Sequence, residues 1–187
     1  MSNYLICSEI NRRTLDEKNF FDLISTRHSV RAFKNDSIPE DKINAILDAA
    51  TKAPSGGNLQ AYQIFVVSSA SEKEKLVDAA HGQGYVAEAP TVLVFCADPK
   101  RSATEYGERG ESLFSIQDAT IACAYAQMAS HNLGFSSVWI GSFDEEKVSN
   151  ILNISNLKPV AILPIGIANE TPDVTPRRPL EEITQKI

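Results

Sequence analysis

The sequence is poor in residues that bind metals or form disulfides. It has three cysteines and three histidines in 187 residues, and neither set has the spacing of metal ligands. Cys96 and Cys123 lie in apolar runs and are predicted to be buried thiols. A reducing compartment is the simplest expectation for such a chain, so we expect a cytoplasmic protein.

Long apolar runs and an excess of positive charge are also absent. No run is long enough to span a membrane, and the first residues do not resemble a signal peptide. Acidic residues number 24 against 18 basic ones, which gives a formal net charge of −6. Nucleic acid is therefore not an expected partner, because binding it requires a basic face. A few arginines in one cleft can still make a local positive field.

The glycine fingerprints of common nucleotide-binding folds are missing. No G-x-G-x-x-G follows a predicted strand, and the chain has no G-x-x-x-x-G-K-[ST] sequence. A G-x-S-x-G nucleophile elbow is missing as well, which argues against a hydrolase of that type. A nucleotide, if one binds, must be held in another way.

Helices and strands alternate along a chain whose length suits a single domain, residues 1–187, with about 1–14 as an N-terminal arm. The strands are nearly continuous apolar runs, so both faces of their sheet should be covered. Residues 101–110 are polar and are expected to form a loop. Strands are predicted at 63–67, 91–97, 136–140 and 159–168, and helices at 15–26, from Pro39 to the loop at Pro54, 71–80, 111–131 and 144–152.

Two arginine clusters stand at opposite ends of this acidic chain. If the first cluster is extended, Arg27, Ser29 and Arg31 share one side and can meet an anion such as phosphate. A solvated basic helix end is the alternative interpretation. Arg177 and Arg178 form the second cluster, which is either a surface pair in a tail or a second contact to the same anion.

Two further segments have the composition of a ring-binding site. Residues 53–60 combine a fixed turn, small residues and two amides, which suit a flat heterocycle; an ordinary helix-ending loop is the alternative. Residues 137–143 end a buried strand and contain Trp139 and Gly141. These residues either lie against a bound ring, or Trp139 is a core residue that precedes a turn. Asp118, a polar residue in an apolar helix, is interpreted as a hydrogen-bonded structural group or as a ligand.

In order and spacing, four stretches of the chain resemble the FMN-dependent nitroreductase family. They are "RHSVRAF", "APSGGNLQAYQIFVV", the stretch from "YGERGESLF" to "SSVWIGSF", and "LPIGIANETPDVTPRRPLEEI", and the likeness covers the chain from about Phe20 onward. The resemblance implies an α+β fold with a central, mostly antiparallel sheet flanked by helices. It also implies a homodimer whose C-terminal extension packs on the partner, with FMN in a cleft at the interface.

The resemblance further implies which residues bind FMN. Arg27, His28 and Ser29 are expected at its phosphate and ribityl end, with Arg31 closer to the ring. The other expected contacts are Pro54, Ser55 and Asn58, contributed by the partner subunit to cover the flavin; Gln83, on the connection after the third helix; Trp139, Ile140 and Gly141, along the isoalloxazine; and Arg177 and Arg178, at the phosphate.

The function implied is a flavin relay. NADH or NADPH gives hydride to FMN, leaves, and is replaced by an electron-poor small molecule, such as a nitroaromatic or a quinone, that is then reduced. No catalytic protein side chain and no metal is expected. Three alternatives remain: a flavin enzyme of the same scaffold with oxidative or dehalogenating chemistry, a flavin-binding module without turnover, and an interaction protein whose arginines are surface charge.

Overall fold

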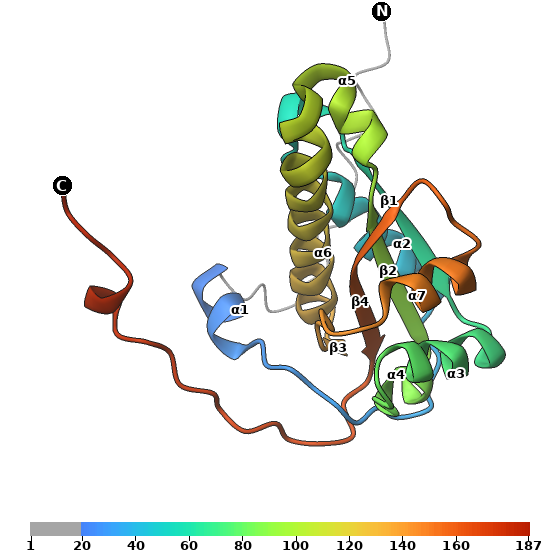
Figure 1. Ribbon diagram of the computed structural model, residues 1–187. Coiled ribbons are helices and arrows are strands. Elements are labelled where there is room, and N and C mark those ends of the chain that lie inside the picture. Colours follow the sequence, from blue (N-terminus) through green and yellow to red (C-terminus); the bar gives the residue numbers. More distant parts are fainter. Residues whose placement is uncertain (1–19) are drawn as a thin grey trace, which may run out of the picture.

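The computed structural model of the protein describes residues 20–187, in which a central sheet lies between layers of helices (Figure 1). The predicted arm, residues 1–14, lies outside the described residues, as does the first part of the helix predicted for 15–26. The strands are β1 (Tyr62–Val67), β2 (Thr91–Ala97), β3 (Ser136–Ser137) and β4 (Lys158–Gly166). The α-helices are α1 (Phe20–Thr26), α2 (Glu40–Thr51), α3 (Ala70–Ala79), α4 (Tyr85–Glu88), α5 (Pro99–Arg109), α6 (Ser115–Asn132) and α7 (Glu145–Leu152), with short turns η1 (Gly56–Asn58), η2 (Gly110–Phe114) and η3 (Leu180–Glu182).

The four strands form one sheet in the order β1-β2-β4-β3, and every neighbouring pair is antiparallel. β2 occupies the run predicted for it, and all of its residues are buried because strands pair with both of its edges and helices cover both of its faces. The prediction of an α+β fold with a mostly antiparallel sheet flanked by helices is confirmed.

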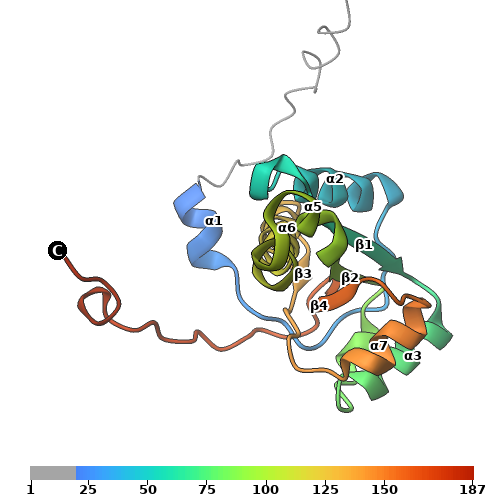
Figure 2. The same cartoon turned by 45° about the horizontal axis from the view of Figure 1, so that its top comes forward.

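Alternation along β2 divides the core into two clusters. Val92 and Val94 face α3, α4 and α7, whereas Leu93 and Phe95 face α2 and α6. Figure 2 shows α2 and α6 on one side of the sheet and α3 and α7 on the other. Each of these four side chains has no exposed surface, and burying one contributes about 1.5–3 kcal/mol.

The prediction of a loop for residues 101–110 is wrong, because most of this stretch belongs to helix α5. Asp98 caps the helix: its carboxylate accepts a hydrogen bond from the backbone N–H of Arg101 at 3.0 Å. Pro99 stands in the first turn, where its missing N–H is not needed. The helix is interrupted near its end by Gly107, at φ 52° and ψ −140°. The capping signal was present in the sequence, but the polar composition concealed it.

Two other predicted boundaries change by more than two residues. The strand predicted for 136–140 is reduced to β3, because beyond Ser137 only an isolated bridge joins Ile140 to Ile162 in β4. The long helix predicted to start at Glu111 starts at Ser115, after the π-helical turn η2. Neither change alters the order of elements.

Candidate functional site

The segment that follows α1 is extended, as one interpretation of the arginine cluster predicted. Ser29 bridges to Ser137 in β3, and the N–H of Val30 donates to the carbonyl of Ser137 at 3.2 Å. On the far side the N–H of Lys34 donates to the carbonyl of Ile167 at 2.9 Å. The segment, which includes the half-buried His28, is therefore fixed beside both β3 and the chain that leaves β4.

Ser29 and Arg31 line a cavity of about 280 Å³ together with residues 170–173 and Thr175 of the C-terminal tail. The carboxylate of Glu170 accepts a hydrogen bond from the backbone N–H of Arg31. Asp173 is also in the wall. This cavity therefore carries negative as well as positive charge, and its acidic side lies beside Arg31.

Positive charge is less compensated at the other end of the segment. Burial lowers the pKa of Arg27, and the positive charge of Arg177 lowers it further. No carboxylate within residues 20–187 lies at ion-pair distance from either guanidinium, and Arg177 donates only to the carbonyls of Thr175 and Pro176. Arg178 differs, because its guanidinium pairs with Glu182 at 3.2 Å. The fold thus brings two cations from opposite ends of the chain close enough to repel each other.

Gln83 and the segment after β3 also meet. The amide nitrogen of Gln83 donates to the carbonyl of Ser142 at 3.4 Å and to that of Ala80 at 2.8 Å. Ile140 is buried and exchanges two backbone hydrogen bonds with Ile162, so the chain around it is held against β4. Trp139 is half-buried and Gly141 is exposed. Gln83 and residues 139–141 therefore lie near one another, with the 27–31 segment on the other side of Ser137.

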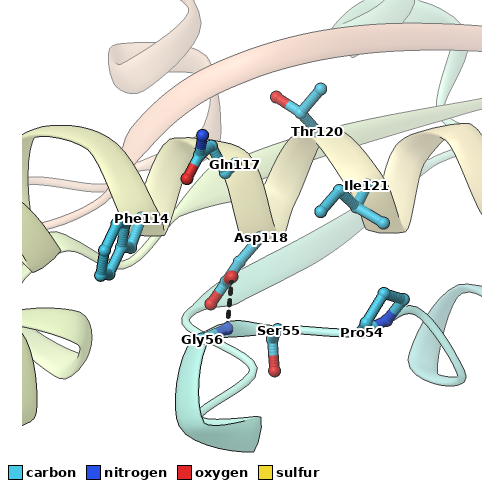
Figure 3. Close-up of a pocket in the computed structure, with 8 residues that line it drawn as sticks. All are labelled: Pro54, Ser55, Gly56, Phe114, Gln117, Asp118, Thr120 and Ile121. Carbon is cyan, nitrogen blue, oxygen red and sulfur yellow. Dashed lines mark hydrogen bonds between the residues drawn. The ribbon is translucent and has the colours of Figure 1, made fainter. Parts of the chain in front are cut away.

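The loop with Pro54, Ser55 and Asn58 is built around Asp118. The two carboxylate oxygens of Asp118 accept hydrogen bonds from the N–H groups of Gly56, at 3.0 Å, and Ala61, at 3.3 Å. In Figure 3 the Asp118 side chain points from α6 toward the loop. Asp118 is 3% exposed, and its structural interpretation is supported.

A cavity of about 500 Å³ lies between this loop and α6 (Figure 3). Its lining is mostly apolar where Pro54, Phe114 and Ile121 form it, and polar at Ser55 and Gln117. The remaining lining residues are Gly56, Asp118 and Thr120.

The sequence did not indicate the aromatic support of this loop. Tyr106 and Phe114 stack edge to face, with ring centroids 5.1 Å apart. A Cβ added to Gly57 would come within 2.6 Å of the Tyr106 hydroxyl, and its φ of 54° also favours glycine. The glycine pair in "PSGGN" was one available signal, since it indicated that something packs closely against the backbone.

The two groups of predicted residues lie at opposite ends of α6. At one end Asp118 holds the loop; at the other the Thr26 hydroxyl is 2.9 Å from the His131 ring, immediately before Arg27. About 13 residues of helix separate Asp118 from His131, which corresponds to about 20 Å. In one protomer the segment 27–31 thus adjoins β3 and Arg177, and Gln83 adjoins the chain after residues 139–141, whereas Pro54, Ser55 and Asn58 lie at the other end of α6.

Within the described part of the chain, no group of three or more His, Cys, Asp or Glu side chains is placed to hold a metal ion. Cys96 and Cys123 are buried free thiols, and burial raises the pKa of Cys96 to about 12 and that of Cys123 well above its usual value. The arrangement offers paired cations, backbone groups and half-buried side chains, which suits binding more than covalent catalysis.

None of the helices in residues 20–187 combines the length and hydrophobicity needed to cross a bilayer.

The fold combines an antiparallel sheet with the long helix α6 and the extended segment 27–31, and this combination can be compared with known families. The model of the Nitroreductase family matches residues 24–96 and 81–167, which together make up more than half of the chain. The protein belongs to the nitroreductase family, so the resemblance predicted from its motifs is confirmed.

Named relatives agree with this assignment. A protein named NADH dehydrogenase of Thermus thermophilus is 29% identical over 185 residues, covering 84% of this chain and 90% of the relative. An oxygen-insensitive NADPH nitroreductase of Salmonella typhimurium is 28% identical over 173 residues, covering 88% and 72%. The structure of an NADPH:FMN oxidoreductase from Vibrio harveyi complexed with NAD⁺ superposes with a TM-score of 0.82 at 25% identity, covering 89% of this chain and 76% of that one.

Proposed function

We propose that the protein is an NAD(P)H-dependent flavin oxidoreductase that holds FMN and reduces an electron-poor small molecule, such as a nitroaromatic or a quinone. The family and the names of its relatives support an NAD(P)H-dependent oxidoreductase. A cytoplasmic location stays a prediction.

The observation that carries the proposal is that Arg27 is half-buried within electrostatic reach of Arg177, while neither guanidinium has a carboxylate partner among residues 20–187. Two like charges held close together destabilise a protein unless an anion lies between them, and burial of Arg27 makes its repulsion stronger. A phosphomonoester carries nearly two negative charges at neutral pH, and guanidinium groups bind its oxygens through paired N–H donors. The FMN phosphate fits this requirement, with His28 and the Ser29 hydroxyl next to it.

FMN, when bound, supplies the redox chemistry, accepting hydride from the nicotinamide and delivering it to the acceptor in alternating half-reactions. The protein's own residues bind and orient. Arg27 and Arg177 fix the phosphate, and Arg178 adds charge nearby if it exchanges its contact with Glu182. Arg31, closer to the ring, provides a positive charge there. Residues 139–141 and Gln83 offer backbone and amide groups along the ring.

The loop with Pro54, Ser55 and Asn58 requires a second subunit in this proposal. It lies about 20 Å along α6 from the arginine cluster, so a partner whose α6 runs the opposite way brings its loop over the flavin. Exposed apolar side chains support a homodimer: Phe20 and Phe21 of α1 are 66% and 75% exposed, and Leu180 of the tail is 67% exposed. In Figure 1 the tail leaves the body beside the segment that follows α1 and extends away on the side of α1, where it can pack on a partner.

Anaerobic reduction tests the function. The FMN-loaded protein is mixed with NADH or NADPH while the flavin absorbance is followed, and an acceptor panel is then added. We expect bleaching by at least one nicotinamide and reoxidation by nitroaromatics or quinones. Flavin that neither nicotinamide reduces would indicate a binding module, bleaching without acceptor turnover would indicate different flavin chemistry, and failure to bind flavin would contradict the proposal.

A subunit-mixing experiment tests the shared site. Arg27→Glu places a negative charge against the phosphate and disables the phosphate half, and Ser55→Trp blocks the loop that covers the flavin, so each homodimer should be inactive. If the halves come from different subunits, random heterodimers contain one intact site, and activity returns to about a quarter of wild type. No recovery from a mixture shown to exchange subunits would place both halves in one chain.

A further inference from the structure

A cationic side chain contacts one of the residues that line the cavity between α6 and the loop around Pro54 and Ser55, here called the covering loop. The guanidinium carbon of Arg109, the last residue of α5, is 5.4 Å from the centroid of the Phe114 ring. Phe114 in turn lines the cavity of about 500 Å³ that also contains Pro54 and Ser55. The edge-to-face contact with Tyr106 fixes the Phe114 ring, and with it the place of the guanidinium that lies over this ring.

Arg109 has unused hydrogen-bonding capacity. Its side chain is exposed, and no carboxylate among residues 20–187 lies at ion-pair distance from it. Contact with an aromatic face holds the guanidinium plane without using its N–H donors, which leaves them for a ligand. A carboxylate is the simplest match, because the guanidinium fork donates two parallel hydrogen bonds to it.

The rest of the cavity favours a flat, apolar body. Pro54, Phe114 and Ile121 supply apolar walls (Figure 3). The one carboxylate in the lining, that of Asp118, is directed at the backbone N–H groups of Gly56 and Ala61, which compensate its charge.

We propose that Arg109 and Phe114 select electron acceptors that are aromatic and carry a carboxylate. The inference rests on the proposed function, in which Pro54 and Ser55 cover the flavin, so that a molecule in this cavity lies next to the ring. The acceptor's ring stacks among the apolar walls, while its carboxylate meets Arg109. Glu108 and Glu111 stand on the same exposed segment and oppose an anion, so the selectivity is moderate.

The test compares two acceptors of similar shape, of which one is an anion and the other is neutral, and a ratio between variants removes their difference in reduction potential. The ratio of kcat/KM for 4-nitrobenzoate to that for 4-nitrobenzamide is measured for the wild type, Arg109→Gln and Arg109→Lys. Removing the charge should lower the ratio about five- to tenfold, as expected for a partly exposed charge-assisted pair, and lysine should retain part of it. Lys75→Gln, which removes a cation on α3 far from the cavity, should leave the ratio unchanged.

Binding supplies a measurement that needs no turnover. Benzoate and benzamide cannot be reduced, and their dissociation constants for the oxidised, FMN-loaded protein are measured by calorimetry. Arg109→Gln should weaken benzoate and leave benzamide unchanged.

An unchanged ratio and unchanged benzoate binding in Arg109→Gln would overturn the inference. A change in the KM for NADPH alone would also overturn it, by assigning Arg109 to the reductant. If the wild type reduces neither 4-nitrobenzamide nor any other nitroaromatic or quinone of the acceptor panel, the proposed function fails instead, so the two failures are distinguishable.

Discussion

Removing the carboxylate of Asp118 is predicted to destabilise the protein through the covering loop. The carboxylate is 3% exposed and accepts hydrogen bonds from the N–H groups of Gly56 and Ala61. Asp118→Ala deletes both acceptors. The N–H of Ala61 is then buried without a partner, while that of Gly56, which is half-buried, can reach water.

The magnitude follows from these two bonds. Leaving a buried donor unsatisfied costs about 1–3 kcal/mol, and the second, wetter bond adds about 1 kcal/mol, so Asp118→Ala should lose about 3 kcal/mol. Asp118→Asn keeps one oxygen for Gly56 but turns its NH₂ group toward the N–H of Ala61, and should lose about half as much. At about 2–4 °C per kcal/mol for a domain of this size, the Tm should fall by about 6–12 °C and 3–6 °C respectively.

Calorimetry of the apo protein measures these shifts, with Gln117→Ala as the matched control on the exposed neighbouring position of α6. The control should move the Tm by about 1 °C or less. Flavin affinity, measured well below the Tm, should also fall for Asp118→Ala because the loop loses its anchor. A Tm for Asp118→Ala equal to that of the control would refute the claim that the carboxylate holds the loop.

Two further predictions concern thiols and a buried amine. In a Cys7→Ser variant, Cys96 and Cys123 should resist a thiol reagent at pH 8 in the native state and react after unfolding. Burial raises the pKa of Cys96 from 9.0 to about 12, so unfolding releases a proton above pH 9. The free energy of unfolding should therefore fall from about pH 9 toward pH 12. Rapid native labelling, or stability that rises in that range, would contradict this. Lys73→Met should lower the free energy of unfolding in denaturant by about 1–3 kcal/mol, because the Lys73 amine donates to two carbonyls around the end of α4, at 2.7 and 3.1 Å. The control Lys75→Met breaks an exposed ion pair and should lower it by less than about 1 kcal/mol. Equal losses of stability in the two variants would show that the bonds to the carbonyls do not stabilise the protein.

Local signals predicted the elements where they were strong. β2 was predicted with its observed bounds because a continuous apolar run buried on both faces has one plausible structure. α5 was missed because the Asp98-Pro99 capping signal precedes a polar stretch that contains Gly107. The short capping signal favours a helix, whereas the polar composition favours a loop, and the chain forms the helix.

The site was predictable as segments but not as an arrangement. Arg27 and Arg177 were each identified, yet their approach depends on how the tail leaves β4, which no local pattern encodes. Asp118 was recognised as unusual, but its partners on the loop are tertiary contacts. The ring pair of Tyr106 and Phe114 was not identified at all, because Tyr106 lies on α5, in a stretch that was predicted to be a loop.

The central claim is that Arg27 and Arg177 together hold a phosphate, and one binding measurement tests it most directly. The affinities of FMN and riboflavin, which differ only by the phosphate, are compared for the wild type, Arg27→Gln, Arg177→Gln and the double variant. The wild type should bind FMN at least about a hundredfold more tightly than riboflavin, each single variant should lose about tenfold of that preference, and riboflavin affinity should stay constant. Equal affinity of the wild type for the two flavins, or a preference for FMN that survives in the double variant, would contradict the account.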